Sequence, residues 1–231
     1  MAYPEHPDTI ILKNRYYSRG LREIDVWNHY QKVKPQLLAE TKNLDLMFII
    51  MVDVNKPIIR RRVNDRTVRL TPQNYDQIIT GRTLSIHKAM GSISTYGIID
   101  VDIDPRDDIR WAIRASKDTY DFVMDKMPIV KKASIRFTGK SSFHILCDFE
   151  RRMKVDTMRF LMHKFLAESE LSRVYQVGGK RKSGVPNLDL DRNCLRCNHI
   201  ALHALSVWGL KCMEVPYTRL ERFNPREAIV R

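Results

Sequence analysis

The chain has 231 residues and a mass of 27.2 kDa, which is long enough for one large domain with a buried core. Hydrophobic residues make up 43% of it and charged residues 29%, as in ordinary globular proteins, so collagen-like, fibrous and disordered classes are excluded. The 40 Lys and Arg residues outnumber the 27 Asp and Glu residues and leave a net charge of +13. This excess indicates a phosphate-rich partner such as nucleic acid or nucleotides, although ribosome-associated and thermophilic proteins also carry basic faces.

In the first 90 residues the patterns predict an amphipathic helix, a buried strand, a hairpin and a short helix, over residues 21–39, 46–54, 58–70 and 71–80. Apolar residues three or four apart define the first helix, which Pro35 kinks or ends. Basic and apolar residues alternate across Asn64-Asp65, a turn-forming pair, and predict the hairpin. No repeat and no Gly/Ser-rich linker marks a domain boundary.

The second half predicts a strand, a helix, two strands, a helix and a strand, over residues 96–103, 107–127, 132–137, 143–149, 153–170 and 185–190. A polar turn, residues 138–142, joins the two middle strands. This order resembles the split βαβ arrangement, whose sheet leaves one face free to carry a site. The sequence therefore predicts an α+β fold.

The longest apolar run, residues 46–52, is far shorter than the ~20 residues of a membrane helix. Residues 1–12 lack the basic start and apolar stretch of a signal peptide, so we expect a cytoplasmic protein with no membrane partner. In that compartment the four cysteines are expected to be reduced thiols: Cys147, Cys194, Cys197 and Cys212.

Asp100, Asp102 and Asp104 alternate with two apolar residues along a predicted strand. Every second side chain of a strand lies on the same face, so the three carboxylates share one face. Carboxylates ~7 Å apart repel one another unless a cation lies between them, and oxygen ligands favour Mg²⁺ or Mn²⁺. The pattern predicts a divalent-metal site; the alternative is a solvated strand edge that ends in an Asp-Pro turn.

Asp189 and Asp191 repeat this alternation in a later predicted strand. A carboxylate that arrives from a second strand is what two-metal phosphoryl transfer requires.

Between the two acidic segments, residues 136–144 (RFTGKSSFH) form a turn of small, hydroxyl and basic residues. Such a turn lets backbone N–H groups approach phosphate, although it lacks the spacing of a Walker A loop and could be a plain hairpin.

The order of these motifs resembles the archaeo-eukaryotic primase superfamily, and most closely the polymerase domains of bacterial ligase D and their stand-alone archaeal relatives. Asp102 to Pro105 (DIDP) is similar to that family's D-[LI]-D-P, and Thr138 to His144 (TGKSSFH) to its S-G-G-K-G-x-H. Asp189 to Asn193 (DLDRN) is similar to D-[WY]-x-Q-N, and His199 to Ala204 (HIALHA) to P-Y-S-L-[RH]-A. Thr83 to His87 (TLSIH) resembles the L-x-x-x-H segment that precedes the first motif.

The resemblance implies a primase-polymerase catalytic domain over residues 1–231. Its parts would be an N-terminal α/β module (about 1–90), an RRM-like catalytic module (91–216) and a tail (217–231), with the active site between the modules. The implied activity is template-directed nucleotide addition to a primer or a starting strand, with two Mg²⁺ or Mn²⁺ ions, in replication or end-joining repair. The implied partners are a DNA template and primer, ribo- or deoxynucleoside triphosphates, and a separate ligase, end-joining or primase subunit.

The resemblance also assigns roles to residues. Asp102, Asp104 and Asp189 would hold the metal ions, and alignment of Pro105 favours this set, although Asp100 with Asp102 also fits the D-x-D pattern. His144 and Lys182 would lie near the triphosphate, His87 near the incoming nucleotide, and His203 near a phosphate or sugar. The full implied nucleotide-binding set is His87, Arg136, Thr138, Lys140, Ser141, Ser142, His144, Lys182 and His203. The basic hairpin would contact the DNA backbone through Arg60, Arg61, Arg62, Arg66 and Arg69, unless it is an ordinary solvated face.

Three alternatives stay open. Cys194-x-x-Cys197, with His199, His203 and Cys212 nearby, could form a zinc knuckle, but the segment leaves little room for a closed tetrahedral site, so we expect no zinc. The altered turn and Ala201, where the family has Ser, fit a catalytically silent nucleic-acid-binding subunit. A metal-dependent nuclease would also use paired aspartates but has less need of a triphosphate-binding turn.

Overall fold

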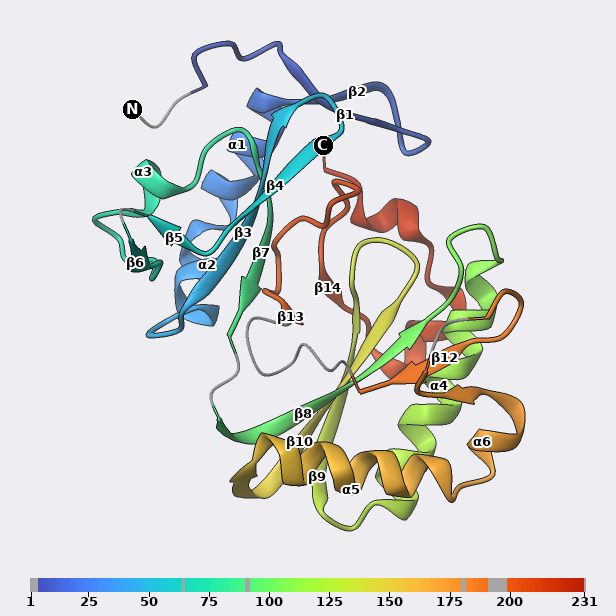
Figure 1. Ribbon diagram of the computed structural model, residues 1–231. Coiled ribbons are helices and arrows are strands. Elements are labelled where there is room, and N and C mark those ends of the chain that lie inside the picture. The colour runs from blue at the N-terminus through green and yellow to red at the C-terminus, as the bar shows by residue number, and fades with distance from the viewer. Residues whose placement is uncertain (1–3, 64, 90–91, 180–181, 191–198, 231) are drawn as a thin grey trace. The chain divides into compact units, whose positions relative to one another are not determined.

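The computed structural model describes residues 4–63, 65–89, 92–179, 182–190 and 199–230, and the chain divides into two compact units (Figure 1). Unit 1 comprises Met1–Ala89, Cys197–Met213 and Asn224–Arg231, and unit 2 comprises Met90–Arg196 and Glu214–Phe223. The first boundary lies one residue from the expected end of the N-terminal module. The two late segments of unit 1, Cys197–Met213 and Asn224–Arg231, lie instead within the catalytic module (91–216) and the tail (217–231) that the resemblance implies. Within the described residues, no helix is long and apolar enough to cross a membrane.

Unit 1 contains an antiparallel sheet with the strand order β13-β7-β3-β4. Its strands in chain order are β3 (Leu46–Asp53), β4 (Lys56–Arg60), β7 (Thr83–Lys88) and β13 (His199–Ile200). The strand expected over residues 46–54 is confirmed by β3, but β7 was not predicted. The hairpin expected over residues 58–70 is shorter: β4 pairs with β3, and β5 (Arg62–Val63) pairs with β6 (Arg66–Thr67). The basic segment is therefore an edge strand followed by a small hairpin, after which Val68 forms an isolated bridge with Leu46.

The helix expected over residues 21–39 is two helices, α1 (Glu23–Lys32) and α2 (Lys34–Glu40). Pro35 lies in the first turn of α2, where its missing N–H costs no helical hydrogen bond, and this explains why α1 ends before it. A further hairpin, β1 (Ile10–Asn14) and β2 (Tyr17–Arg22), precedes α1. The remaining short elements are α3 (Tyr75–Ile78) and the 3₁₀-helix η3 (Pro225–Ala228).

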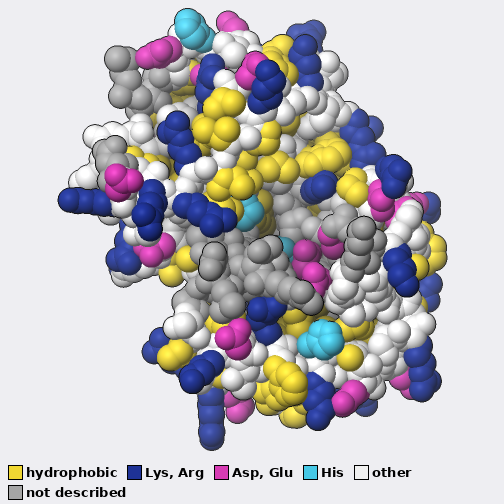
Figure 2. Space-filling view, viewed as in Figure 1, with side chains coloured by type: hydrophobic (Ala, Val, Ile, Leu, Met, Phe, Trp, Pro, Cys, Tyr) yellow, Lys and Arg dark blue, Asp and Glu magenta, His cyan; other side chains and the backbone are white. Residues whose placement is uncertain are grey.

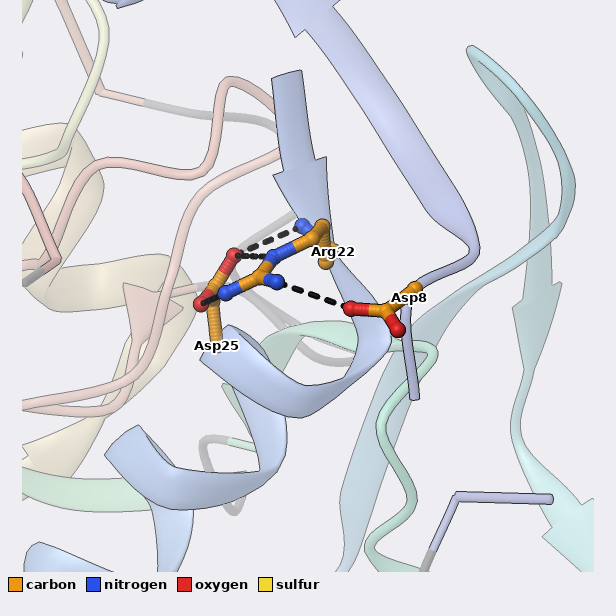
Figure 3. Close-up of polar contacts among 3 residues, drawn as sticks. All are labelled: Asp8, Arg22 and Asp25. Atoms are coloured by element: carbon orange, nitrogen blue, oxygen red, sulfur yellow. Dashed lines mark hydrogen bonds and ion pairs between the residues drawn. The ribbon is translucent and has the colours of Figure 1, made fainter. Parts of the chain in front are cut away.

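An ion-pair cluster fixes the start of α1 (Figure 3). The backbone N–H of Arg22 donates to Asp25 Oδ2 at 3.0 Å, so the carboxylate caps the helix from its first turn. The Arg22 guanidinium donates to both oxygens of Asp25, at 3.1 and 3.0 Å, and to Asp8 Oδ1 at 2.8 Å. This arrangement joins the N-terminal segment to α1.

Two buried tyrosines organise the core of unit 1. Tyr30 on α1 is fully buried, and its hydroxyl donates to the Leu84 carbonyl of β7 and accepts from the Leu205 N–H at 3.1 Å. Tyr75 of α3 is also fully buried and donates to the Tyr30 carbonyl at 2.8 Å. Each buried hydroxyl is therefore satisfied, and residues 199–213 are tied to a core built mainly from the first 89 residues.

Unit 2 contains a six-stranded sheet with the order β11-β12-β8-β10-β9-β14. Its strands are β8 (Ile93–Asp102), β9 (Val130–Phe137), β10 (Phe143–Lys154), β11 (Gln176–Val177), β12 (Asn187–Asp189) and β14 (Met213–Glu214), whose first residue belongs to unit 1. Its helices are α4 (Ile109–Lys126), α5 (Val155–Ala167), α6 (Leu171–Val174) and the 3₁₀-helix η2 (Tyr217–Arg222). The expected sequence of strand, helix, two strands, helix and strand is present as β8, α4, β9, β10, α5 and β12. Adjacent strands among β12, β8, β10 and β9 are antiparallel.

The two faces of this sheet differ in chemistry. On one face, Ile99 and Val101 of β8 lie beside Ile145 and Phe143 of β10, and all four are fully buried. Helix α5 covers this face at Gly97, where an added Cβ would lie 2.7 Å from the sulfurs of Met158 and Met162. Since side chains alternate along a strand, the even-numbered residues of β8 face the other way. That second face carries the polar residues described next.

Candidate functional site

Four polar side chains form one row across four strands of unit 2. Asp189 of β12 is directly opposite Asp100 of β8, Asp100 is opposite His144 of β10, and His144 is opposite Arg136 of β9. Directly opposed residues of antiparallel strands project to the same face, with Cα atoms ~4.5–5.5 Å apart. The Nε2 atom of His144 lies 3.7 Å from Asp100 Oδ1, and both side chains are largely buried. The sheet therefore gathers two carboxylates, an imidazole and a guanidinium.

A second row lies one pleat further along. Asp102 is opposite Asn187 of β12 and shares the face of Asp100, two residues away. Asn187 is 4% exposed, and its Oδ1 has no hydrogen-bond partner among the described residues. Asn187 was not predicted as a site residue, although it lies two residues before Asp189 and therefore on the same face of the strand. With Asp100, Asp102 and Asp189 it completes a group of oxygen donors on adjacent strand positions.

Asp104 has different surroundings. It follows the end of β8 and forms a two-oxygen ion pair with Arg106, with N–O distances of 2.9 and 2.8 Å. These hydrogen bonds, with smaller help from the charge of Lys140, lower the pKa of Asp104 from 3.8 to about 2. Asp104 is therefore ionised and already paired with the Arg106 guanidinium. Asp100 and Asp102, in contrast, lie on the same sheet face as Asp189.

The turn between β9 and β10 is closed by Thr138 and Ser142. The Thr138 N–H donates to the Ser142 carbonyl at 3.1 Å, and the two hydroxyl oxygens lie 2.7 Å apart. Gly139 has φ +85°, a left-handed conformation that suits glycine in a tight turn. Ser141 is 5% exposed, and its Oγ has no hydrogen-bond partner among the described residues. A buried hydroxyl without a protein partner is the feature expected of a turn that contacts a ligand.

The aromatic side chains at the base of this turn pack together. Phe137 and Phe143 are directly opposite across β9 and β10, with ring centroids 5.5 Å apart. Phe223, at the end of unit 2, packs on both rings at 4.9 and 5.7 Å. The two strand ends that carry the turn are thus held by a three-ring cluster.

The other predicted nucleotide-binding residues are Lys182, His87 and His203. Lys182 is exposed in the loop before β12 of unit 2. Asp191, the second residue of the later aspartate pair, lies outside the described residues. His87 of β7 and His203 belong to unit 1. The Nε2 atom of His87 lies 2.7 Å from Ser85 Oγ, and burial lowers its pKa from 6.5 to about 4. The described structure thus groups Arg136, Thr138, Ser142 and His144 around one end of the sheet, together with Lys140 and Ser141.

His203 lies in a strained loop of unit 1. Its backbone has φ +70°, which is uncommon for a residue other than glycine. The His203 N–H donates to the Cys212 carbonyl at 2.9 Å, and the His203 carbonyl lies 2.8 Å from His29 Nε2. Burial, assisted by the charges of Lys211, His203 and Lys32, lowers the pKa of His29 from 6.5 to about 4. His29 is therefore a neutral imidazole at pH 7.

Acid should destabilise the protein through His29. An unfolded histidine with a pKa near 6.5 binds its proton more readily than buried His29, so stability is lost as pH falls from 6.5 to 4. A shift of this size corresponds to about 3 kcal/mol at the acid end of the range. Urea unfolding at pH 7.0, 5.5 and 4.5 should show a smaller pH dependence for His29→Gln than for the wild type. His6→Gln, which changes an exposed histidine, should keep the wild-type dependence, and equal pH dependence in all three proteins would contradict the assignment.

The predicted DNA-contacting arginines are all exposed in unit 1. Figure 2 shows Lys and Arg side chains over the segment from β4 to β6, at the left of the view. Arg60 ends the edge strand β4, and Arg62 and Arg66 lie in the small hairpin. Arg69 forms an ion pair with Asp45, with an N–O distance of 2.7 Å. The cluster is therefore a basic surface, with Arg69 partly neutralised.

The cysteine pattern falls mostly outside the described residues, since Cys194 and Cys197 are not among them. Cys212 and His199 are both 1% exposed, and Cys147 is a buried free thiol. Within the described residues, no three His, Cys, Asp or Glu side chains are grouped closely enough to hold a metal ion as placed.

Unit 2 thus defines a mixed α+β protein with a covered apolar sheet face and an acidic and basic opposite face. The whole chain has the fold of the polymerase domain from Mycobacterium tuberculosis ligase D, whose structure was solved in complex with DNA. The match has a TM-score of 0.73 and 11% sequence identity, and it covers 97% of this chain and 89% of that one. No family model matches the chain, and no curated protein sequence matches it.

Proposed function

We propose that the protein is a template-directed nucleotidyltransferase of the primase-polymerase type. The observation that carries the proposal is the placement of Asp100, Asp102 and Asp189 on one face of antiparallel strands. This face lies beside a turn whose buried Ser141 hydroxyl has no hydrogen-bond partner in the described part of the chain. The chain shares its fold with a DNA polymerase domain, and this likeness supports the proposed nucleotidyl transfer. In this proposal the strand order β12-β8-β10-β9, with α4 and α5 in the crossovers, is an RRM-like catalytic module.

The donor set of the acidic face fits a pair of Mg²⁺ or Mn²⁺ ions. Three carboxylates and the amide oxygen of Asn187 are hard oxygen ligands, and the buried Asn187 Oδ1 lacks a protein partner among the described residues. Asp100, Asp102, Asp189 and Asn187 would hold the ions, and their side chains would have to come closer together on binding, since no three His, Cys, Asp or Glu of the described residues are now grouped closely enough. When bound, such ions lower the pKa of an attacking 3′-hydroxyl and neutralise charge on the leaving pyrophosphate.

The chain's own residues would bind and orient the triphosphate. Arg136 and His144, next to the carboxylate row, would donate hydrogen bonds to phosphate oxygens. The left-handed Gly139 lets the backbone of the turn approach the phosphates, and Ser141 Oγ would gain the partner it lacks. Lys140, whose charge already acts on Asp104, would add positive charge at the same end of the sheet.

The basic surface of unit 1 is proposed to contact the phosphate backbone of a DNA template or primer. Changing Arg61, Arg62 and Arg66 to Ala should weaken binding of a primed template and reduce the slope of log K against log salt by about 2 to 3, one phosphate contact per residue. Arg69→Ala should change the slope less than any of these three, because the ion pair with Asp45 partly neutralises that guanidinium. An unchanged slope in the triple variant would mean that this surface is only a solvated face.

A primer-extension assay tests the proposed function. The protein is incubated with primed and unprimed templates, labelled ribo- or deoxynucleotides and Mn²⁺, and we expect template-directed extension that EDTA abolishes. Binding of the template without extension would instead favour the catalytically silent subunit. Shortening of the labelled strand would favour a nuclease. Roles in replication or end joining, and a separate ligase or primase partner, are further parts of the proposal that purified partners can test.

A further inference from the structure

A cavity of about 580 Å³ lies wholly within unit 1. Three separate segments form it: one end of α1, residues 203–211, and residues 226–230 near the C-terminus. Backbone hydrogen bonds connect the last two segments, since the Lys211 N–H donates to the Ala228 carbonyl at 2.8 Å. No residue of the acidic face in unit 2 lines this cavity. Ligand pockets of ~300–1,000 Å³ accept molecules of nucleotide size, so the cavity is larger than a single phosphate ion needs.

The charges around the cavity favour a dianion. Lys32, Lys211 and Arg226 supply three formal positive charges, and Glu227 supplies one negative charge. One oxygen of Glu227 accepts the Asn224 N–H at 3.1 Å and caps η3. A phosphomonoester carries a charge of about −1.5 to −2 at pH 7 and three acceptor oxygens, which matches the net positive charge of these side chains. Arg226 can bind two of those oxygens at once.

The remaining walls have two characters. Val33, Ile229 and Val230 form an apolar part, while Asn28 offers an amide and His29 and His203 offer rings. His29 is 7% exposed, and its Nε2 atom is engaged by the His203 carbonyl. In the neutral ring that bond uses the one N–H, so protonation would add a second donor at Nδ1. The backbone of His203 has a left-handed conformation, and its carbonyl contacts the His29 ring. This strained residue is therefore part of the cavity wall.

We propose that this cavity binds a phosphomonoester of nucleotide size, with the phosphate held by Lys32, Lys211 and Arg226. The apolar wall would contact the uncharged part of the ligand, and Asn28 would hydrogen-bond to it. This site goes beyond the proposed nucleotidyl transfer, because it uses neither the acidic face nor a divalent ion.

Calorimetry with the full chain in EDTA tests the proposal, with AMP, inorganic phosphate, adenosine and an oligonucleotide without terminal phosphates as ligands. We expect AMP to bind more tightly than phosphate, and adenosine not to bind. Lys32→Gln combined with Arg226→Gln should weaken AMP binding by about 100-fold, about tenfold for each cation removed. Lys42→Gln, an exposed lysine of unit 1 outside the cavity, is the control and should leave AMP binding unchanged.

The His29 ring gives a second readout that does not depend on catalysis. Its NMR resonances should shift when AMP binds, and its pKa should rise, because a bound dianion stabilises the imidazolium. Absence of AMP binding, binding that the double variant does not weaken, or tighter binding of the oligonucleotide would each overturn the proposal. Asp102→Asn should bind AMP in EDTA as the wild type does, so failure of the proposed catalytic function and failure of this site can be told apart.

Discussion

Asp102→Asn is expected to reduce metal-dependent nucleotide incorporation by about 10³-fold or more, with the fold and template binding retained. The substitution keeps the shape of the side chain but removes the charge that the proposed divalent ions require. Asp189→Asn should have an effect of similar size. Primer extension measures the loss, and urea unfolding with template titration checks that each variant is folded and binds DNA.

The same assay decides which residue joins Asp102. The sequence favours Asp104, because Pro105 then aligns with the D-[LI]-D-P motif, but the strand register sets Asp100 opposite Asp189 and sets Asp104 beyond the strand, paired with Arg106. We therefore expect a large loss for Asp100→Asn and less than about a tenfold loss for Asp104→Asn. The reverse order of effects would assign the metals to Asp102 and Asp104. Full activity in every aspartate variant would remove the metal proposal altogether.

Phe223→Ala is expected to destabilise the protein by about 3 to 4 kcal/mol. The ring is 8% exposed and packs on Phe137 and Phe143, so its removal leaves a cavity in the three-ring cluster. Phe160→Ala makes the same change at a position that is 68% exposed, and it should cost less than about 0.5 kcal/mol. Urea unfolding of the two variants gives the comparison.

The effect of Phe223→Ala should extend to catalysis. Phe137 and Phe143 flank the turn that carries Ser141, so a loosened cluster should raise the KM for nucleotide. Phe223→Leu, which refills most of the volume, should recover stability and KM together. If Phe223→Ala is as mild as Phe160→Ala, the aromatic cluster does not support the turn.

Local pattern was sufficient for the six main elements of unit 2, β8, α4, β9, β10, α5 and β12, but it did not predict the short elements α6, β11, β14 and η2. Continuous apolar runs and strict alternation predicted β8, β9 and β10, and the period of two placed Asp100 and Asp102 on one face. Local sequence pattern did not predict the register between strands that are distant in the sequence. The pairing of Asp189 with Asp100 depends on how a three-residue strand aligns with β8 across more than eighty residues, and no short-range signal encodes that.

Unit 1 was harder to predict for a related reason. In β7, Leu84 and Ile86 alternate with polar residues, a period-two signal that could have predicted this strand. The hairpin of β1 and β2 lacks such a cue, because Arg15 and Tyr16 separate the strands and no Asn-Gly or Asp-Gly pair marks the turn. The cavity of unit 1 draws residues from positions near 30, 205 and 228, so only tertiary folding brings them together. Sequence reasoning assigned His203 by resemblance but had no means to connect it with His29.

The discontinuity of unit 1 has a consequence for biosynthesis. Ile200, Leu205 and Val230 belong to the same apolar core as residues of the first 89, so synthesis must reach residue 230 before that core can close. At ~5–20 residues per second, the early segment spends several seconds outside the exit tunnel with its apolar side chains uncovered. The strands from β8 to β12 emerge in one uninterrupted stretch during that interval. Nascent-chain folding should therefore begin with the second unit, and the N-terminal segment is the part that a chaperone would protect.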